Sequence, residues 1–328
     1  MNALVYLGPR SLELQELPEP IPGAGEARVR MRAAAICGSD LHGFREASPR
    51  RIPPLVMGHE VVGTIDAVGD GVDPVLVGER VVAMPVVSCG ACARCVEGRP
   101  NLCPNRRLMG MNFPGSFAEA FTIPAAQLLP VPASISDEVA SVAEPLANAV
   151  HVVDRSVREG DDVLVIGAGP IGLFAARAAV LSGAKRVSVT DPVAARLELA
   201  RSLGAEPIAP DAAHDLADPG VDVVIDAAGF PTTWATAVDT ARFGGRIEAI
   251  GLGAVEGPLA YQAVVAKGLT ITGAYACVAD DFRRALDLLE FGAVDVASWI
   301  TTMRLADGGR AFEELVDDGR HVKVVLVP

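Results

Sequence analysis

The sequence predicts an α/β protein in which an irregular, β-rich domain is joined to a doubly wound, parallel-sheet domain. Three observations predict this fold class. Short apolar runs alternate with helix-like stretches through the middle of the chain, and a glycine-rich turn follows the first of these runs. Short β-rich segments broken by Pro and Gly fill the first part of the chain. We place the β-rich domain at residues 1–147, completed by residues 274–328, and the parallel-sheet domain at residues 148–273.

The elements of the β-rich domain are short and irregularly spaced. Strands are expected at residues 27–35, 60–68 and 80–84. The tail after residue 274 is too short to fold alone and is expected to complete this domain. Its predicted elements are a helix at 280–289, a strand at 299–304, a helix near 311–316 and a strand at 322–327.

The middle of the chain has a regular rhythm of strand and helix. Continuous apolar strands separated by helices are typical of a parallel sheet covered on both faces. The predicted strands are 162–166, 186–190, 221–225, 246–250 and 269–272, and helices are expected at 171–181, 193–203 and 232–242.

Charge and composition exclude several classes of partner. The formal net charge is −13, and a nucleic-acid or anionic-membrane surface would require a basic face instead. The start of the chain lacks the basic and apolar regions of a signal peptide, and no apolar stretch is long enough to span a bilayer. We therefore expect a cytoplasmic protein. Thiols stay reduced there, so clustered cysteines are interpreted as metal ligands before disulfides.

A dinucleotide-binding turn is predicted where the first strand of the middle region ends. Three glycines there match G-x-G-x-x-G directly between a strand and a helix, the context that gives this motif meaning. The first glycine permits the tight turn, the second allows the backbone to approach a pyrophosphate, and the third allows helix and strand to pack closely. The phosphates would bind the free N–H groups at the start of the helix. The segment is Gly167-Ala168-Gly169-Pro170-Ile171-Gly172.

Asp191 follows the second strand of this region, about twenty residues after the glycines. A carboxylate at this point accepts hydrogen bonds from ribose hydroxyls and repels a 2′-phosphate, which selects NAD over NADP. A role in capping the helix that Pro192 opens is compatible with this one. Arg196 also belongs to the predicted cofactor site and could favour NADP, but it lies one helical turn further on. We therefore predict NAD.

Four cysteines lie within fifteen residues, with the pattern C-x2-C-x2-C-x7-C. Thiolates at this spacing can surround one tetrahedral ion, and a closed shell of four thiolates is typical of a structural zinc site. An iron–sulfur cluster and free thiols are the alternatives, although bacterial ferredoxins use a shorter final gap. The predicted ligands are Cys89, Cys92, Cys95 and Cys103.

A second zinc site is predicted from residues that are far apart in the sequence. Cys37 stands in CGSDLH, His59 in GHE and Glu144 in EPLAN. A thiolate, an imidazole and a carboxylate can form the three protein ligands of an open, catalytic zinc site. Each residue alone has an ordinary alternative, because a lone Cys or His is more often a buried or surface side chain.

The order of the motifs adds a resemblance. Together they resemble the zinc-containing medium-chain dehydrogenases, in the branch of sorbitol and other polyol dehydrogenases that includes galactitol-1-phosphate 5-dehydrogenase and threonine 3-dehydrogenase. The resemblance covers essentially the whole chain and implies a GroES-like catalytic domain and a Rossmann domain. Its motifs are CGSDLH, GHE, the four-cysteine loop, GSFAE, EPLANAVH and VIGAGPIG.

The resemblance also implies roles for individual residues. Cys37 and His59 would bind the catalytic zinc, and Glu144 would bind it directly or through water. Glu60 would be an occasional ligand at most, since a second bound carboxylate would weaken the Lewis acidity of zinc. Residues matching the proton relay and the nicotinamide contact are Ser39, His42 and Asn148.

These roles predict a reaction. Hydride leaves a carbon easily only when the attached oxygen has lost its proton, and zinc lowers the pKa of bound water from about 15.7 to roughly 7. We therefore expect an oxidoreductase that converts a secondary alcohol, such as a polyol or cyclitol, into a ketone with NAD and two zinc ions. Dehydrogenases of an amino alcohol or a sugar-alcohol phosphate are the alternative. A non-catalytic zinc- or nucleotide-binding protein is a third hypothesis. The resemblance also implies a homodimer or homotetramer.

Two features depart from sorbitol dehydrogenases. Gly43 stands where an aromatic residue is common, which should widen the substrate pocket. Arg45, Arg50 and Arg51 lie in the following loop, where they could bind a substrate phosphate or carboxylate or could simply be solvated. Cys277 remains unassigned and is expected to pack near a dimer edge.

Overall fold

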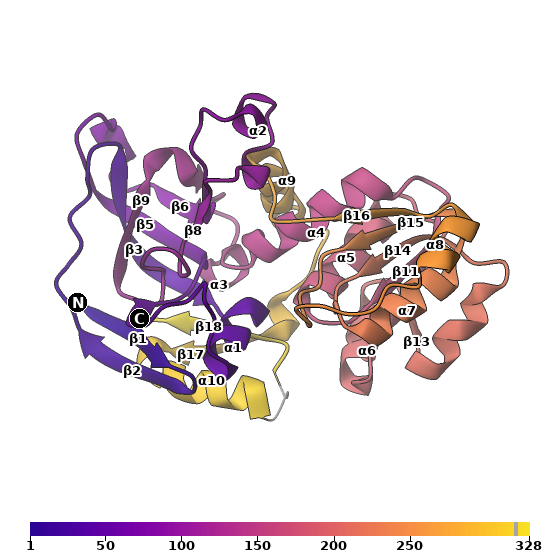
Figure 1. Ribbon diagram of the computed structural model, residues 1–328. Coiled ribbons are helices and arrows are strands. Elements are labelled where there is room, and N and C mark those ends of the chain that lie inside the picture. The colour runs from indigo at the N-terminus through magenta and orange to yellow at the C-terminus, as the bar shows by residue number, and fades with distance from the viewer. Residues whose placement is uncertain (318–320) are drawn as a thin grey trace. The chain divides into compact units, whose positions relative to one another are not determined.

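A computed structural model describes residues 1–317 and 321–328. The chain forms two compact units, one of residues Met1–Glu144 and Val278–Pro328 and the other of residues Pro145–Cys277. The predicted α/β fold class is confirmed: the first unit is rich in β-strands, and the second is a parallel sheet with helices (Figure 1). No helix within the described ranges is both long and apolar enough to cross a membrane.

The first unit is built on a seven-stranded, mostly antiparallel sheet. The last strand of the chain pairs with the third, so the C-terminal tail is part of this sheet. The strand order is β10 (Leu128–Pro130), β6 (Arg80–Ala83), β5 (Glu60–Val68), β3 (Glu26–Ala35), β18 (Lys323–Val327) and β17 (Ile300–Arg304), with β9 (Ala120–Pro124) also paired with β3.

Strand β3 shows why this sheet forms. Along its first half, Ala27, Val29 and Met31 are buried, whereas the arginines between them lie at the outer face. Alternation with a period of two gives a strand one apolar and one polar face. The strand ends in Ala33–Ala35, all of which are buried. Strand β3 therefore leads from the outer part of the sheet into the core.

Two small sheets and five helices complete the first unit. One sheet has the order β2 (Ser11–Glu16), β1 (Asn2–Gly8) and β4 (Leu55–Val56), and the other pairs β7 (Val86–Val87) with β8 (Arg107–Leu108). The helices are α1 (Gly38–Arg45), α2 (Ala93–Val96), α3 (Asp137–Ala140), α9 (Ala279–Glu290) and α10 (Gly308–Asp317).

An aromatic cluster fixes α1 in the core. Phe44, near the end of α1, lies with its ring centroid 5.2 Å from that of Phe312 on α10. Phe117 meets Phe312 edge to face at 5.8 Å. All three side chains are at most 1% exposed. Tilted aromatic pairs at these distances add to the free energy gained by burial. The helix that begins beside Cys37 is therefore held in place by packing at its other end.

The second unit contains a six-stranded, fully parallel sheet. Its strand order, numbered within the unit, is 3-2-1-4-5-6, the doubly wound arrangement of dinucleotide-binding folds. The strands, in spatial order, are β13 (Glu206–Ile208), β12 (Arg186–Thr190), β11 (Asp162–Ile166), β14 (Val221–Asp226), β15 (Ala241–Ala249) and β16 (Thr270–Gly273).

The helices of the second unit follow the predicted alternation. They are α5 (Pro170–Leu181), α6 (Ala194–Ser202), α7 (Pro231–Thr240) and α8 (Tyr261–Lys267), while α4 (Ala143–Ser156) begins two residues before the unit. Several details differ from the sequence prediction, since helices α4 and α8 were not predicted. Strand β13 was not predicted, because three residues at a sheet edge carry little pattern. Strand β15 begins at Ala241 instead of residue 246.

Candidate active site and metal centres

Three predicted site residues meet where two neighbouring strands adjoin. Cys37 precedes α1, two residues after β3 ends, and His59 lies immediately before β5. Strands β3 and β5 are antiparallel, with Ala35 paired with Glu60. The end of one strand therefore lies beside the start of the other. Candidate ligand atoms of Cys37, His59 and Glu60 all lie within 4.8 Å of one another.

Gly58 makes this geometry possible. Its φ of +94° lies in the left-handed region, which side chains other than hydrogen rarely allow. A Cβ atom at Gly58 would also lie 2.7 Å from the ring of Phe117. The glycine thus lets the chain turn sharply against the aromatic core and present His59 to Cys37.

The surroundings of His59 are strongly negative. Its Nδ1 lies 3.6 Å from Oδ1 of Asp40, which is fully buried. Burial lowers the pKa of His59, but the charges of Asp40, Cys37 and Glu144 outweigh burial and raise that pKa to about 10. The group of residues therefore favours a positive charge at this point, as expected of a cation-binding site.

Glu60 is paired with a lysine from the opposite end of the chain. Lys323 in β18 forms an ion pair with Glu60 and donates a hydrogen bond to the carbonyl oxygen of Ile36 at 3.0 Å. Burial lowers the pKa of Lys323, but the charges of Glu60, Cys37 and Glu144 raise it overall. Glu144 lies on α4 and is 7% exposed, and its charge contributes to raising the pKa values of His59 and Lys323. It is not one of the three groups within 4.8 Å, so its role as a zinc ligand stays a prediction.

The residues present fit a zinc ion. Oε1 of Glu60 is buried and has no hydrogen-bond partner among the described residues. Buried polar atoms without partners are rare and are explained by an ion that they would bind. Sulfur, imidazole and carboxylate form a ligand set that zinc accepts. With Nδ1 turned toward Asp40, Nε2 of His59 is the nitrogen available to a metal.

Ser39 and His42 lie three residues apart on α1, and therefore on one face of the helix. Ser39 is half-buried and accepts a hydrogen bond from Nη2 of Arg51 at 3.2 Å, while His42 is exposed. Burial and the charges of Arg45 and Arg51 lower the pKa of His42, although Glu46 opposes them. His42 is therefore neutral at neutral pH and able to accept a proton. The relay itself stays a prediction.

Of the three arginines that follow CGSDLH, two are solvent-exposed, as one interpretation expected, and one is buried. Arg45 and Arg50 are exposed, but Arg51 is only 4% exposed and pairs with Asp40 at 3.0 Å. A Cβ atom on Gly43 would lie 2.5 Å from Cδ of Arg51. The expectation that Gly43 widens the pocket is therefore wrong, because the side chain of Arg51 fills the space.

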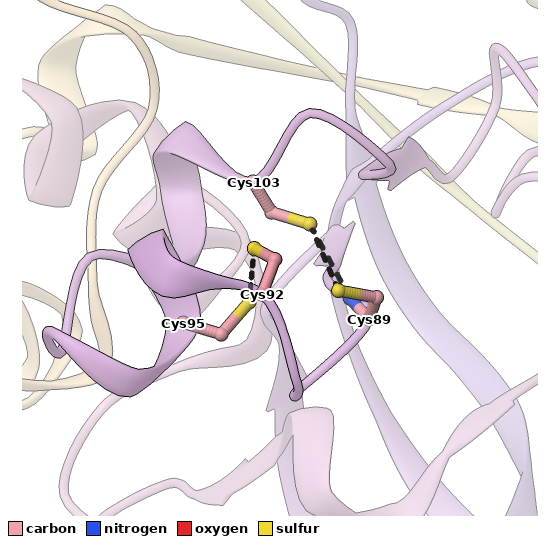
Figure 2. Close-up of side chains that lie close together, drawn as sticks. All are labelled: Cys89, Cys92, Cys95 and Cys103. Carbon is pink, nitrogen blue, oxygen red and sulfur yellow. Dashed lines mark hydrogen bonds between the residues drawn. The ribbon is translucent and has the colours of Figure 1, made fainter.

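The four-cysteine loop closes on itself, as Figure 2 shows. The four Sγ atoms lie within 4.8 Å of one another, and the pairs Cys92–Cys95 and Cys89–Cys103 are 3.5 Å apart. A tetrahedron with Zn–S bonds of about 2.3 Å has edges of roughly 3.8 Å, so these separations suit one zinc ion. All six cysteines of the chain lie within residues 1–317 and are free thiols.

The pKa values of two thiols in this loop, Cys89 and Cys92, are shifted in opposite directions. Backbone N–H groups of Ala91 and Cys92 lower the pKa of Cys89 to about 6. The backbone N–H of Cys95 lowers the pKa of Cys92, but burial and the neighbouring thiols outweigh it and raise that pKa to about 11. Four thiolates this close repel one another, and a divalent cation would compensate their charge.

The glycine-rich turn has the predicted form in the second unit. Gly167, directly after β11, has a φ of +99°. Gly169 is the N-cap of α5, Pro170 is its first residue and Ile171 the next, so free N–H groups of the helix lie at this turn. A Cβ atom on Gly172 would overlap the carbonyl oxygen of Gly167. The third glycine thus allows the helix to pack on the turn.

Asp191 holds the glycine turn from the neighbouring strand. Its Oδ2 accepts a hydrogen bond from the N–H of Ala168 and its Oδ1 accepts one from Val193, both at 2.8 Å. Arg196 lies 3.9 Å from the same carboxylate. Asn148 is half-buried on α4. Contacts of these residues with a cofactor stay predictions. Cys277 is half-buried at the end of the second unit, and its packing role likewise stays a prediction.

The sequence analysis missed three features of the site: Asp40, Lys323, and the pairing with Asp40 of Arg51, which was named only as a possible substrate contact. Asp40 stands inside CGSDLH but received no role. Lys323 had a detectable signal, because a lysine between apolar residues of a buried strand needs a partner. Arg51 had none, since its loop shows no regular pattern.

The chain matches two family models, one described as "Alcohol dehydrogenase GroES-like domain" over residues 23–133 and the other as "Zinc-binding dehydrogenase" over residues 170–290. It is 35% identical to an L-threonine 3-dehydrogenase of Rhizobium johnstonii, covering 99% of this chain and 98% of that protein.

Two solved structures have the same fold over essentially their whole length. An alcohol dehydrogenase (rspB) from Escherichia coli CFT073, complexed with NADH, is 34% identical with a TM-score of 0.93, covering 100% of this chain and 99% of that one. The 2R,3R-butanediol dehydrogenase from Bacillus subtilis is 25% identical with a TM-score of 0.91, with the same coverage. The chain therefore belongs to the zinc-dependent alcohol dehydrogenase family.

Proposed function

We propose that this enzyme oxidises a secondary alcohol to a ketone with NAD, using one catalytic and one structural zinc ion. The observation that carries this proposal is the cluster of half-buried Cys37 with buried His59 and Glu60, in a chain whose other unit has a glycine-rich turn of the dinucleotide-binding type. The reaction balances as alcohol plus NAD⁺ giving ketone, NADH and one proton. When bound, zinc supplies Lewis acidity toward the substrate oxygen, and NAD supplies the hydride acceptor.

We propose that Cys37, His59 and Glu144 hold the catalytic zinc, with Glu60 kept nearby by Lys323. The ion pair supports this arrangement, because Lys323 neutralises the second carboxylate. One thiolate and one carboxylate already balance the charge of Zn²⁺. Asp40 supports His59 from behind, as a carboxylate commonly does for a ligating histidine.

The proton of the substrate hydroxyl leaves through residues of α1. Ser39 accepts it and passes it on, and the exposed His42 delivers it to solvent. The lowered pKa of His42 supports this role, since a neutral imidazole can accept the proton. When bound, NAD would supply the acceptor for the hydride of the substrate C–H bond, and Asn148 would contact its nicotinamide.

The test is a panel of alcohols assayed by NADH absorbance. Secondary alcohols, namely butane-2,3-diol, sorbitol and L-idonate, are expected to react. Activity should disappear after zinc is removed with a chelator and return when zinc is restored. A protein that oxidises neither these substrates nor L-threonine, or that is fully active without metal, would overturn the proposal.

L-Threonine is the second candidate substrate. The 35% identity to a protein named L-threonine 3-dehydrogenase favours it, and carbon 3 of threonine also bears a secondary hydroxyl. Comparing kcat/KM for L-threonine with that for butane-2,3-diol separates an amino-alcohol dehydrogenase from one acting on neutral diols.

The preference for NAD is assigned to Asp191. Its buried carboxylate lies beside the glycine turn, where it would accept bonds from ribose and repel a 2′-phosphate. Asp191→Ala should lower kcat/KM with NAD by about tenfold or more and reduce the discrimination against NADP, because a hydrogen bond to a charged group contributes about 1.5–3 kcal/mol. A wild type that reacts faster with NADP would contradict the assignment.

We also place the protein in the cytoplasm as a homodimer or homotetramer. The free cysteines support a reducing compartment, because two zinc sites require reduced thiols. Light scattering coupled to gel filtration measures the assembly, and a monomer at working concentration would contradict it.

A further inference from the structure

Arg51 reaches the candidate active site through space that Gly43 leaves open. Its side chain is 4% exposed although it comes from the loop after α1. A Cβ atom on Gly43 would lie 2.5 Å from Cδ of Arg51, 3.2 Å from Nε and 3.3 Å from Nη1. Any larger residue at position 43 would therefore push the guanidinium away. The two residues form a matched pair.

The guanidinium contacts two residues of α1 with a single nitrogen. Nη2 lies 3.0 Å from Oδ1 of Asp40 and 3.2 Å from Oγ of Ser39. A guanidinium only donates hydrogen bonds and keeps its charge at every physiological pH. These two bonds therefore have a fixed direction, and Ser39 is the acceptor in its bond to Arg51.

This direction limits what Ser39 can do. A hydroxyl has one proton to donate and two lone pairs to accept with. Arg51 occupies one lone pair, which leaves one for the substrate hydroxyl and one proton to pass on. The arginine thus orients Ser39 as an acceptor from substrate and a donor to the next group in the relay.

The same arginine anchors the carboxylate behind His59. Oδ1 of Asp40 accepts a hydrogen bond from Arg51 and lies 3.6 Å from Nδ1 of His59, and Oδ2 accepts a hydrogen bond from the N–H of Cys37 at 3.2 Å. Asp40 is fully buried, and a buried carboxylate is strongly destabilised without a cation beside it. Arg51 therefore fixes the position of a group that touches both Cys37 and His59.

Resting on the function proposed above, we propose that Arg51 is a positioning residue for the dehydrogenase reaction, admitted by Gly43, that orients Ser39 for proton transfer and holds Asp40 behind His59. A direct role in binding an anionic substrate fits the geometry less well. The charge of Arg51 is already paired with Asp40, and the side chain has almost no exposed surface.

The first test compares Arg51→Met with Arg50→Met, an exposed arginine one residue earlier in the same loop. Arg51→Met should lower kcat by about 10- to 100-fold, the range for groups that support metal ligands, with KM changed less than about threefold. The solvent isotope effect on kcat should rise, because proton transfer becomes slower. Arg50→Met should match the wild type. An unchanged kcat and isotope effect in Arg51→Met would overturn the proposal.

A second test follows the metal and needs no turnover. Zinc release to a chromogenic chelator should be about tenfold faster from the catalytic site of Arg51→Met than from the wild type, and the visible spectrum of cobalt-substituted protein should change. The structural zinc should be released at the wild-type rate. Zinc release can be measured even if the wild type proves inactive toward every alcohol. It therefore separates a failure of the role proposed for Arg51 from a failure of the proposed function. Identical release rates and cobalt spectra would contradict the role of Arg51 behind His59.

A double-mutant cycle tests the pair. Introduced alone, Gly43→Ala should lower kcat nearly as much as Arg51→Ala does, because the added methyl group displaces the guanidinium of Arg51. Added to Arg51→Ala, the same change should cost nothing further. Additive losses would show that Gly43 acts independently of Arg51.

If Arg51→Met fails to fold, Gly43→Ala still tests the proposal, because it displaces the guanidinium while the arginine itself is retained. A rise in KM confined to substrates that carry a carboxylate, such as L-threonine and L-idonate, at unchanged kcat, would instead identify Arg51 as a substrate contact and overturn its positioning role.

Discussion

The two proposed metal centres of the first unit differ in what surrounds their ligands. The four cysteines come from fifteen consecutive residues, and their neighbours are mainly backbone N–H groups and one another. Cys37 and the consecutive residues His59 and Glu60 come from two separate segments and are enclosed by buried charged partners, namely Asp40, Lys323 and Arg51. The same metal can therefore have different roles. A shell closed by four thiolates fixes a loop, whereas a site with varied ligands and buried ion pairs can leave a position open for substrate.

Removing one ligand of the buried centre should have the largest effect on activity. Cys37→Ser should lower kcat by at least about a thousandfold, because metal-assisted polarisation is lost. Zinc content should fall from two ions to one per chain while the circular dichroism spectrum is retained. A fully active variant would remove Cys37 from the site and with it the contrast between the two centres.

Removing a ligand of the cysteine loop should instead affect stability. Cys103→Ala deletes the buried member of the four and should release one zinc ion. We expect the Tm to fall by roughly 10 °C, on the order of 3 kcal/mol, because metal binding and folding of the loop are coupled. Calorimetry and zinc analysis measure this. A variant with unchanged zinc content and Tm would show that the loop does not hold a metal.

Altering the carboxylate behind His59 should have an intermediate effect on catalysis. Asp40→Asn keeps the shape but removes the charge near Nδ1, and should weaken zinc binding or activity by about 10- to 100-fold. Only the catalytic zinc should be affected. Equal loss of both zinc ions in a metal titration would mean that the substitution acts by unfolding the unit.

Breaking the ion pairs of Asp66 with Arg28 and Arg30 should have the smallest effect on stability, and it serves as a control for general destabilisation. Burial raises the pKa of Asp66, but hydrogen bonds and charges from Arg28 and Arg30, both at 2.7 Å, lower it overall from 3.8. This stabilisation is present above the unfolded pKa and is lost as pH falls through the folded pKa. Asp66→Asn should therefore reduce the free energy of unfolding by about 1 kcal/mol at pH 7, with the difference vanishing in strong acid. Urea unfolding at several pH values checks this. Loss of either zinc ion in Asp66→Asn would show that the metal centres respond to general stability and not to their own ligands.

Much of the fold was predictable because it rests on local patterns. The strands and helices of the second unit follow from periodicity, and the glycine turn follows from its place between β11 and α5. The edge strand β13 was missed because three residues carry too little pattern. Residues 274–328 were expected to complete the first domain, and in the structure residues from Val278 onward lie in the first unit.

The ligands of the site were predictable, but their surroundings were not. Cys37, His59 and the four cysteines belong to short motifs with recognisable spacing. The partners depend on strand register and loop packing, which no local pattern encodes. Lys323 reaches Glu60 only because β18 pairs with β3, and Arg51 reaches Asp40 only because Gly43 lacks a side chain.

The bonding of Asp191 has a consequence for redesign of the cofactor preference. Both of its oxygens already accept backbone hydrogen bonds, one from the glycine turn and one from the start of the next helix. Replacing it to admit a 2′-phosphate would also remove two backbone anchors, one of the glycine turn proposed to bind the pyrophosphate and one of the start of α6. A redesign for NADP would therefore need a residue at position 191, for example serine or asparagine, that still accepts these backbone hydrogen bonds, in addition to any new positive charge.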